Sequence, residues 1–275
     1  MFDDFPPRQD AAPHPSEPLR PAPVAVTVEV VESYEGFRRL RPAWSALQER
    51  DPEMTVFLSW AWLDGAFRDN PGRWRIFVVR ARGEGGRAHA YGVDARSEDD
   101  MIQLFDRVER EVGPIEVLVF NIGANVNFQI TETTARVYRK VWEMSAFAGF
   151  LAGREAARVM IPRETGTIIF TGATASVRGG AGFSAFAGAK FALRALAQSM
   201  ARELGPKGIH VAHAIIDGAI DTAFIRDNFP ERYKLKNMDG ILDPDAIADA
   251  YFMLHSQPRS AWTQELDLRP WIEKF

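Results

Sequence analysis

Apolar and polar positions follow two periods along the last two thirds of the chain, and these periods predict alternating strands and helices. Short apolar runs predict strands at 88–93, 115–120, 167–171, 210–216 and 265–268. Longer stretches with apolar residues every three or four positions predict helices at 98–112, 134–161 and 184–204. Near-continuous apolar strands that alternate with helices indicate an α/β fold, in which a parallel sheet carries helices on both faces.

Residues 24–86 have a different pattern. A strand at 24–31 precedes a helix at 34–48, and a second short helix is predicted at 58–68. Strands at 75–82 and 87–93 flank a Gly-Glu-Gly-Gly run, which predicts a hairpin turn between them. Four tryptophans fall in this stretch, and their spacing is typical of a core. They are Trp44, Trp60, Trp62 and Trp74.

The first 23 residues contain seven of the 17 prolines, mixed with Asp, Ser and Arg. Such a segment buries too little apolar surface to offset its ordering entropy, so we expect a disordered tail. The predicted organisation is therefore a tail at 1–23, a second part at 24–86 and a third part at 87–275.

Composition excludes several classes of protein. Among 275 residues the net charge is −4, which argues against a nucleic-acid partner. The chain has no cysteine, so disulfides and thiolate-bound zinc are excluded, and the five histidines lack the spacing of metal ligands. We predict no metal site. No signal peptide or membrane-spanning run is visible, and we expect a cytoplasmic protein without a membrane partner.

Phe186 and Lys190 lie four residues apart in the run Ser-Ala-Phe-Ala-Gly-Ala-Lys, so they share one face of the predicted helix. The run resembles the active-site helix of the short-chain dehydrogenase/reductase family, whose signature is Tyr-x-x-x-Lys. The resemblance extends over 87–275. It implies a Rossmann-like fold and an oxidoreductase that uses NAD or NADP on a small-molecule substrate. It also implies that Lys190 binds the nicotinamide ribose, although a lysine on a helix is equally often solvated.

Further positions match the family's cofactor-binding motifs in order and spacing. Asp94 matches the aspartate that accepts a hydrogen bond from the adenine amino group. Asn121 and Gly123 lie where the family has Asn-Asn-Ala-Gly, and Gly218 and Thr222 lie where it has Pro-Gly-x-x-x-Thr. The resemblance therefore assigns these residues to cofactor binding. Taken without the family, Asp94 is equally a helix cap and Asn121 a link between strands.

Three of the family's four catalytic positions are changed. Phe186 replaces the tyrosine that exchanges the substrate proton, Ala173 replaces the serine and Ser145 replaces the asparagine of the long helix. Only Lys190 is retained. Phenylalanine cannot carry a proton, and general acid–base catalysis is typically worth ~10²–10⁴-fold, so we expect impaired or atypical activity.

Four hydroxyl groups are near the expected pocket and are candidates to replace the lost phenol: Thr171, Thr174, Ser176 and Ser184. Ser184 is the best placed, but its direction on the helix differs from that of residue 186. We expect Ser184 to cap the helix that it opens.

The family's Gly-rich diphosphate turn has no counterpart before Asp94. The nearest equivalent is Glu-Ser-Tyr-Glu-Gly at 32–36, where two carboxylates would repel a diphosphate. The first βαβ unit is thus expected to be replaced by an unrelated segment, and the choice between NAD and NADP cannot be read. Residues 24–86 resemble the start of the Fem-like branch of the GNAT acetyltransferases, through Ala-Trp-Ser-Ala-Leu at 43–47 and Trp-Arg-Ile-Phe-Val-Val-Arg at 74–80. This implies a chimera.

Two functions stay open. The first is an atypical oxidoreductase with an apolar substrate pocket around Phe183 and residues 224–242. The second is a non-catalytic fold that binds a small ligand or another protein. A third function, an acyltransferase-like role of residues 24–86, ranks last, because nothing in the chain matches the acyl-CoA-binding part of that fold. The helices at 134–161 and 184–204 resemble those through which the family forms homo-oligomers.

Overall fold

The computed structural model describes residues 25–31, 34–39, 41–42, 76–82, 89 and 91–274. The chain divides into two compact units, residues 1–90 and 91–275. The predicted tail at 1–23 and the predicted helix at 58–68 lie outside the described residues, as do residues 40 and 43–48 of the predicted helix at 34–48.

In the first unit, β1 (Ala25–Val31) pairs with β2 (Ile76–Arg82) in an antiparallel ladder that places Ala25 opposite Arg82. Helix α1 (Tyr34–Arg39) follows β1. Both strands were predicted, but their pairing was not, and the ladder covers all seven residues of each strand. The hairpin turn predicted at 83–86 lies outside the described residues.

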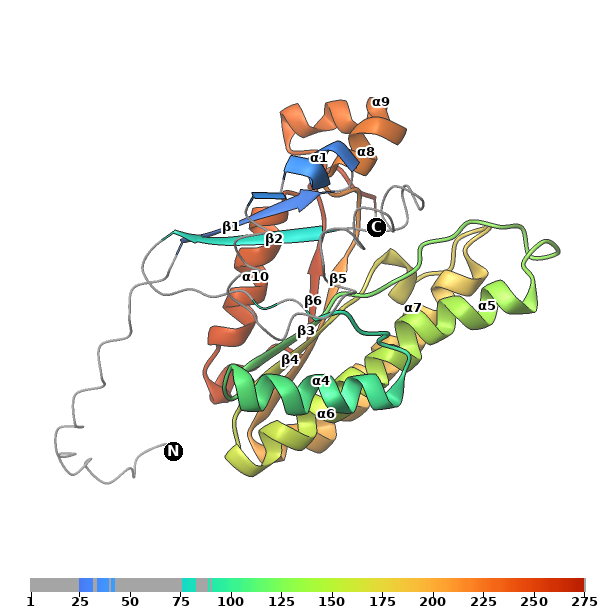
Figure 1. Ribbon diagram of the computed structural model, residues 1–275. Coiled ribbons are helices and arrows are strands. Elements are labelled where there is room, and N and C mark those ends of the chain that lie inside the picture. The colour runs from blue at the N-terminus through green and yellow to red at the C-terminus, as the bar shows by residue number, and fades with distance from the viewer. Residues whose placement is uncertain are drawn as a thin grey trace, which may run out of the picture. The chain divides into compact units, whose positions relative to one another are not determined.

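The second unit is built on a parallel sheet in the order β3-β4-β5-β6 (Figure 1). The strands are β3 (Val117–Phe120), β4 (Gly166–Thr171), β5 (Ile209–Ile216) and β6 (Glu265–Leu268). All four were predicted within two residues. Because the strands are parallel and in register, their carboxyl ends lie at one edge of the sheet.

The strand predicted at 88–93 is wrong for the residues that the structure describes there, since His89 and residues 91–93 form no strand. The reason is topological. Doubly wound sheets have the strand order 3-2-1-4, so the third strand pairs only with the second, and the second and first strands lie between it and the fourth. Among the described residues no strand pairs with the outer edge of β3, and none pairs with the apolar run before Asp94.

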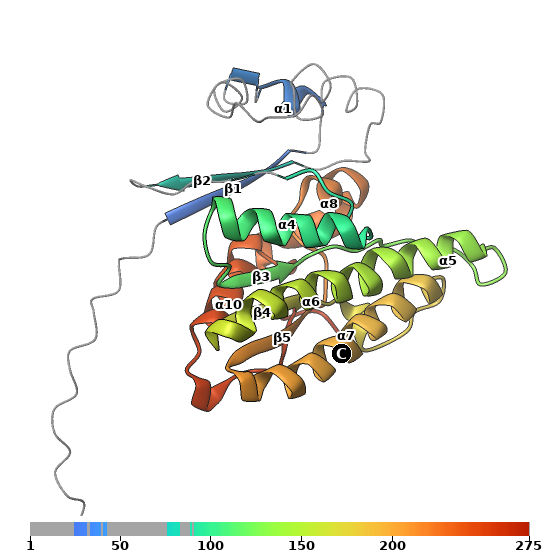
Figure 2. The same cartoon turned by 60° about the horizontal axis from the view of Figure 1, so that its bottom comes forward.

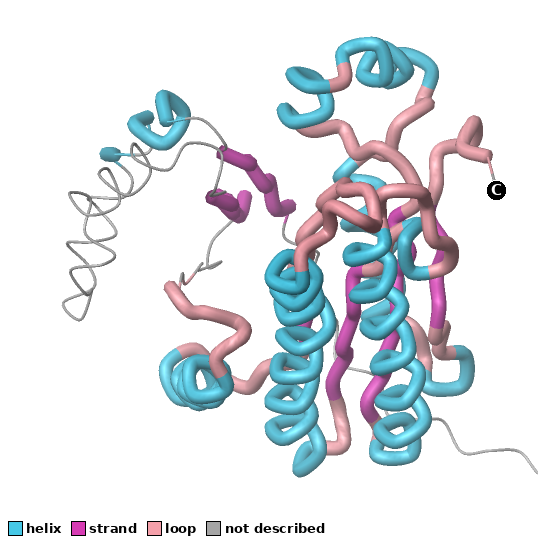
Figure 3. The backbone as a smooth tube through the Cα atoms, turned by 90° about the vertical axis from the view of Figure 1, so that its right-hand side faces the viewer, coloured by secondary structure: helices cyan, strands magenta, loops and turns pink. Residues whose placement is uncertain are grey.

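The helices predicted at 98–112, 134–161 and 184–204 are confirmed as α4 (Glu98–Glu111), α5 (Ala135–Trp142) with α6 (Ala148–Met160), and α7 (Ser184–Leu204). Three further helices were not predicted: α8 (Ala223–Asn228), α9 (Pro230–Tyr233) and α10 (Pro244–Ser256). A π-helical turn, Glu143–Phe147, joins α5 to α6, and together they form the predicted long helix. Figures 2 and 3 show α6 and α7 running side by side. Among the described helices, none is long and apolar enough to cross a membrane.

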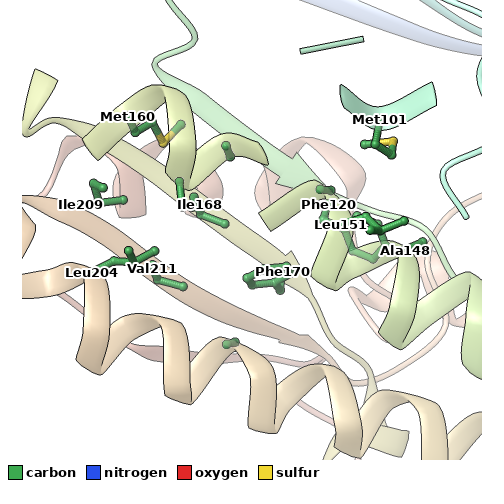
Figure 4. Close-up of a cluster of buried hydrophobic side chains, with 14 of the residues drawn as sticks. Met101, Phe120, Ala148, Leu151, Met160, Ile168, Phe170, Leu204, Ile209 and Val211 are labelled. Atoms are coloured by element: carbon green, nitrogen blue, oxygen red, sulfur yellow. The ribbon is translucent and has the colours of Figure 1, made fainter. Parts of the chain in front are cut away.

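Alternate residues of the strands supply two cores, one on each face of the sheet. Ile168 and Phe170 of β4 pack with residues of α6 and α7, whereas Ile169 packs with Leu254 of α10. Figure 4 shows the first core, where the rings of Phe120 and Phe170 are 6.1 Å apart. Each fully buried side chain of this size contributes about 1.5–3 kcal/mol, so this packing stabilises the carboxyl edge of the sheet.

Two glycines on one face of α6 allow close packing against the sheet and α7. A Cβ on Gly149 would lie 2.5 Å from Leu193 Cδ1, and one on Gly153 would lie 2.9 Å from Phe170 Cζ. Because these positions are four residues apart, they form a single contact face on the helix.

Candidate active site

The predicted site residues gather where the chain leaves the carboxyl ends of the strands. Gly123 follows β3, Ala173 follows β4 and Gly218 follows β5, while Phe186 and Lys190 project from the first two turns of α7. Ligands of parallel α/β sheets bind at this edge. Within it, the structure brings Gly123, Phe186 and Lys190 into contact.

Lys190 is buried, with 4% of its surface exposed, so the solvated alternative is wrong. Its Nζ donates a hydrogen bond of 2.8 Å to the carbonyl oxygen of Thr171, and that of Ile122 lies 3.5 Å away. No carboxylate in the described part of the chain lies within ion-pair distance of Nζ. Burial therefore acts on an uncompensated charge and lowers the pKa of Lys190 from 10.5 to about 8.

Phe186 and Gly123 flank that amine. The Lys190 Nζ lies 6.0 Å from the centre of the Phe186 ring, on the shared helical face that the spacing predicts. Gly123 is exposed, and a Cβ there would lie 3.3 Å from Nζ and 4.0 Å from Phe186 Cε2. The missing side chain of Gly123 thus leaves the buried amine close to the surface.

The loop after β4 is held by hydroxyl groups that already have partners. Ala173 donates its backbone N–H to Ser176 Oγ at 3.1 Å, and Thr174 donates its hydroxyl to the buried Asp217. Thr171 Oγ1 is 2.9 Å from the hydroxyl of Tyr251. Three of the four candidate hydroxyls are therefore engaged in structural hydrogen bonds.

Ser184 does not cap α7, so that prediction is wrong. Phe183 occupies the cap position and Ser184 is already the first helical residue. A capping side chain must come from the residue before the helix, whose backbone is not helical. Among the described residues, neither the buried Ser184 Oγ nor that of the fully buried Ser145, in the π-helical turn, has a hydrogen-bond partner.

The predicted adenine-binding residue, Asp94, lies in the turn that precedes α4. Its carboxylate accepts hydrogen bonds from the Arg96 backbone N–H at 3.0 Å, from Nε at 2.9 Å and from Nη2 at 2.5 Å. These bonds lower the pKa of Asp94 to about 2. A carboxylate has about four acceptor positions, so one remains for a ligand. The N-cap of α4 is Ser97, so Asp94 is not the helix cap.

Around β5 the structure places the remaining predicted residues. Gly218 has φ +147°, in the region that favours glycine, and a Cβ there would lie 2.8 Å from Pro270 Cδ. Thr222 caps α8, since its hydroxyl accepts the N–H of Ile225 at 3.4 Å and keeps its own proton to donate. Asn121 follows β3 directly and is exposed.

A partly buried charge network beside the site was not predicted. Arg194 of α7 binds Glu265 of β6 through two bonds of 2.6 Å, and Glu265 Oε2 lies 3.2 Å from Nδ1 of His213 on β5. Burial lowers the pKa of His213 to about 4, so the ring is neutral at pH 7. The only indication of this network in the sequence is the carboxylate of Glu265 within a short predicted strand.

Known proteins share this architecture. The family model of short chain dehydrogenases matches residues 72–232. The (21S)-21-acetoxyl-apo-melianone synthase of Melia azedarach is 31% identical over 171 residues, which cover 58% of this chain and 62% of that protein. The chain spans less than two thirds of the length of the curated relatives that it matches.

Two solved structures extend the comparison. A short-chain dehydrogenase from Rhodopseudomonas palustris is 52% identical, with a TM-score of 0.57 over 68% of this chain and 76% of that chain. A tyrosine-to-phenylalanine variant of ElxO with NADPH bound is 17% identical, with a TM-score of 0.59 over 64% of this chain and 75% of that one, and it shows likeness of fold. The family match begins before residue 87, whereas the acetyltransferase resemblance stays a prediction.

Proposed function

Since this chain belongs to the short-chain dehydrogenase family, we propose that it binds NAD or NADP and a small carbonyl or alcohol compound, and that it catalyses hydride transfer slowly. The observation that carries the proposal is the position of Lys190. Its buried amine lies at the carboxyl edge of the sheet, between Gly123 and Phe186. A charged donor at that edge, beside a backbone without a side chain, suits the nicotinamide ribose.

The other residues fit parts of the cofactor. Asp94 has one acceptor position left for the adenine amino group, and Thr222 has a proton to donate to the carboxamide. Gly123 and Gly218, which carry no side chain, would allow the backbone to approach the ligand, and Asn121 lies beside Gly123 on the same loop. The bound nicotinamide would supply or accept the hydride. A glycine-rich diphosphate turn is missing from the sequence before Asp94, so we expect weaker binding than a complete family member would show.

Proton transfer is the limiting part of the proposed reaction. Phe186 and Ala173 offer no exchangeable proton, and Ser145 is fully buried. The titratable group that remains beside Phe186 is Lys190, whose pKa of about 8 allows it to hold or release a proton near neutral pH. Without a positioned phenol, the expected loss is ~10²–10⁴-fold.

Titration with NADH and with NADPH, followed by cofactor fluorescence, tests binding. We expect binding by the parent protein and a roughly tenfold or greater loss in Lys190→Met, because a hydrogen bond to a charged group is worth about 1.5–3 kcal/mol. The control is Lys207→Met, at an exposed lysine just after α7. No binding at millimolar cofactor would contradict the proposal. The ElxO variant supports it, since that protein holds NADPH with a phenylalanine in place of a tyrosine.

The double substitution Phe186→Tyr with Ala173→Ser tests the chemistry. It restores the family's hydroxyl groups, so reduction of small aldehydes and ketones by NADPH should rise by about 10²-fold or more. Phe191→Tyr is the matched control, because it adds a phenol at an exposed position one residue after Lys190. Cofactor binding without any gain of activity would favour the second function, a non-catalytic binding fold.

Self-association fits either function. Trp142, Phe147 and Phe150 form a row of stacked rings along α5 and α6, with 6.3 Å between successive centres. Trp142 and Phe150 are exposed, as is Phe191 on α7. Exposed aromatic rows of this kind are typical of protein interfaces, so we propose a homo-oligomer that forms through these helices. A cytoplasmic location stays a prediction from the sequence.

A further inference from the structure

We propose that Lys190 is a covalent binding site for small aldehydes and ketones, whose carbonyl carbon its Nζ attacks to form an imine. This goes beyond cofactor binding and needs no nicotinamide. It rests on three features of the same side chain: the groups that Nζ contacts, the opening at Gly123 and the protonation state that burial imposes.

The contacts of Nζ leave the amine able to react. Its protein partners are the carbonyl oxygens of Thr171, at 2.8 Å, and Ile122, at 3.5 Å. Neither is charged, so no ion pair fixes the nitrogen as an ammonium. On the side where the family has a tyrosine hydroxyl, Phe186 presents an apolar ring whose centre is 6.0 Å away.

Gly123 provides the route to the amine. The residue is exposed, and Nζ lies 3.3 Å from the point that a Cβ on Gly123 would occupy. A small carbonyl compound seated over Gly123, where a side chain would otherwise lie, would thus have its carbonyl carbon next to Nζ. A larger side chain at this position would stand between the solvent and the nitrogen.

Burial keeps a fraction of the Lys190 amine in its neutral form, which is the nucleophile. Only a neutral amine attacks a carbonyl carbon, and a solvated lysine with pKa ~10.4 is almost entirely charged at pH 8. The pKa of Lys190 is about 8, so about half of the molecules hold a neutral amine at that pH. Lysines that are desolvated in apolar surroundings are the usual imine-forming residues of proteins.

The reaction balances without an oxidant or a reductant. The nitrogen lone pair forms a C–N bond with the carbonyl carbon. The oxygen takes one proton from the nitrogen and one from the solvent, and it leaves as water when the C–O bond breaks. The protonated imine retains a single N–H. Thr171 oxygen, at 2.8 Å, can accept it, and the bond that is given up is the long one to Ile122. Imine formation therefore costs the site little hydrogen bonding.

Reductive trapping tests the proposal on the full chain without cofactor. Butanal and sodium cyanoborohydride would convert an imine into a stable butyl amine, which peptide mapping by mass spectrometry locates. The chain has no cysteine to compete for the aldehyde. The lysines available for comparison are Lys140, Lys190, Lys207, Lys234, Lys236 and Lys274. At pH 8 we expect Lys190 to be modified at least about tenfold faster than Lys207, with a pH midpoint near 8.

Two variants sharpen the result. Gly123→Ala should slow modification of Lys190 and leave that of Lys207 unchanged, because its methyl group would lie 3.3 Å from Nζ. Lys190→Arg should abolish the fast adduct. Modification of Lys190 in the parent protein no faster than that of Lys207 would overturn the proposal, and this comparison requires no variant. Because the measurement omits NADH and NADPH, its failure would leave the cofactor proposal standing, and failure of cofactor binding would leave this one standing.

Discussion

The side chain of Lys190 brings a positive charge into surroundings that offer it only backbone carbonyl groups and an aromatic ring. Desolvation disfavours the ammonium form and lowers its pKa to about 8. Folding therefore carries an electrostatic cost that is fully present below pH 8. Such costs are common at functional sites, where a charge is kept despite its effect on stability.

We predict that the stability difference between Lys190→Met and the parent depends on pH. Between the folded pKa of about 8 and the ordinary 10.5, the unfolded chain holds the proton and the folded protein does not. The free energy of unfolding of the parent should therefore rise by about 3 kcal/mol relative to the variant from pH 7 to above pH 10. Urea unfolding across this range measures it, with Lys207→Met as control. A constant difference would contradict the low pKa.

Gly218 gives a second prediction at this scale. Its φ of +147° and the Pro270 Cδ atom 2.8 Å from a Cβ position both disfavour any side chain. Gly218→Ala should lower the free energy of unfolding by about 1–3 kcal/mol. Gly179→Ala is the matched control, since nothing lies within 4 Å of a Cβ there. Equal effects of the two substitutions would show that the backbone at 218 adapts.

The sequence could predict which side chains share a face, but not which atoms they meet. Four-residue spacing places Phe186 and Lys190 together on α7. The partners of Nζ come from residues 19 and 68 positions away, and they are carbonyl groups, which every residue has. The same limit hid the network of Arg194, Glu265 and His213, because three elements must pack before it exists.

Among the elements, boundaries were predictable where the chain has strong local signals. Helix α7 begins and ends as expected, since glycines precede it and Gly205 and Pro206 follow. The strand before Asp94 was wrong for the opposite reason. Its apolar pattern is local, whereas a strand exists only if a neighbouring strand accepts its hydrogen bonds.

The glycine face of α6 carries a prediction about packing. Gly149→Val or Gly153→Val would force side chains into Leu193, or into Phe170 and Met200, which lie within 3 Å of the Cβ positions. We expect each to lower the free energy of unfolding by about 1–3 kcal/mol. Gln103→Val, at an exposed position of α4, controls for the helix propensity of valine. Thermal unfolding with no difference among the three would contradict close packing.

At the scale of the whole molecule, substitutions that introduce a charged side chain test the proposed homo-oligomer. Phe150→Glu and Phe191→Glu place carboxylates on the exposed faces of α6 and α7, and each should shift the protein towards monomers, because burying an unpaired charge is costly. Light scattering after size-exclusion chromatography measures the mass. The control is Phe252→Glu, at an exposed position of α10. A parent protein that is monomeric at all concentrations would contradict the proposal.

Strand β5 lies between two paired neighbours, and all eight of its residues are buried, whereas β3 has a described partner only in β4. This asymmetry sets the order in which the sheet opens. Amide protons of β5 should exchange with deuterium slowest, at rates close to those of global unfolding, and those of β3 much faster. Partial opening would then begin at β3 and the chain that follows it, which includes Gly123. Compounds that bind beside Gly123 should therefore be recognisable by the slower deuterium uptake that they cause in β3 and in the chain that follows it.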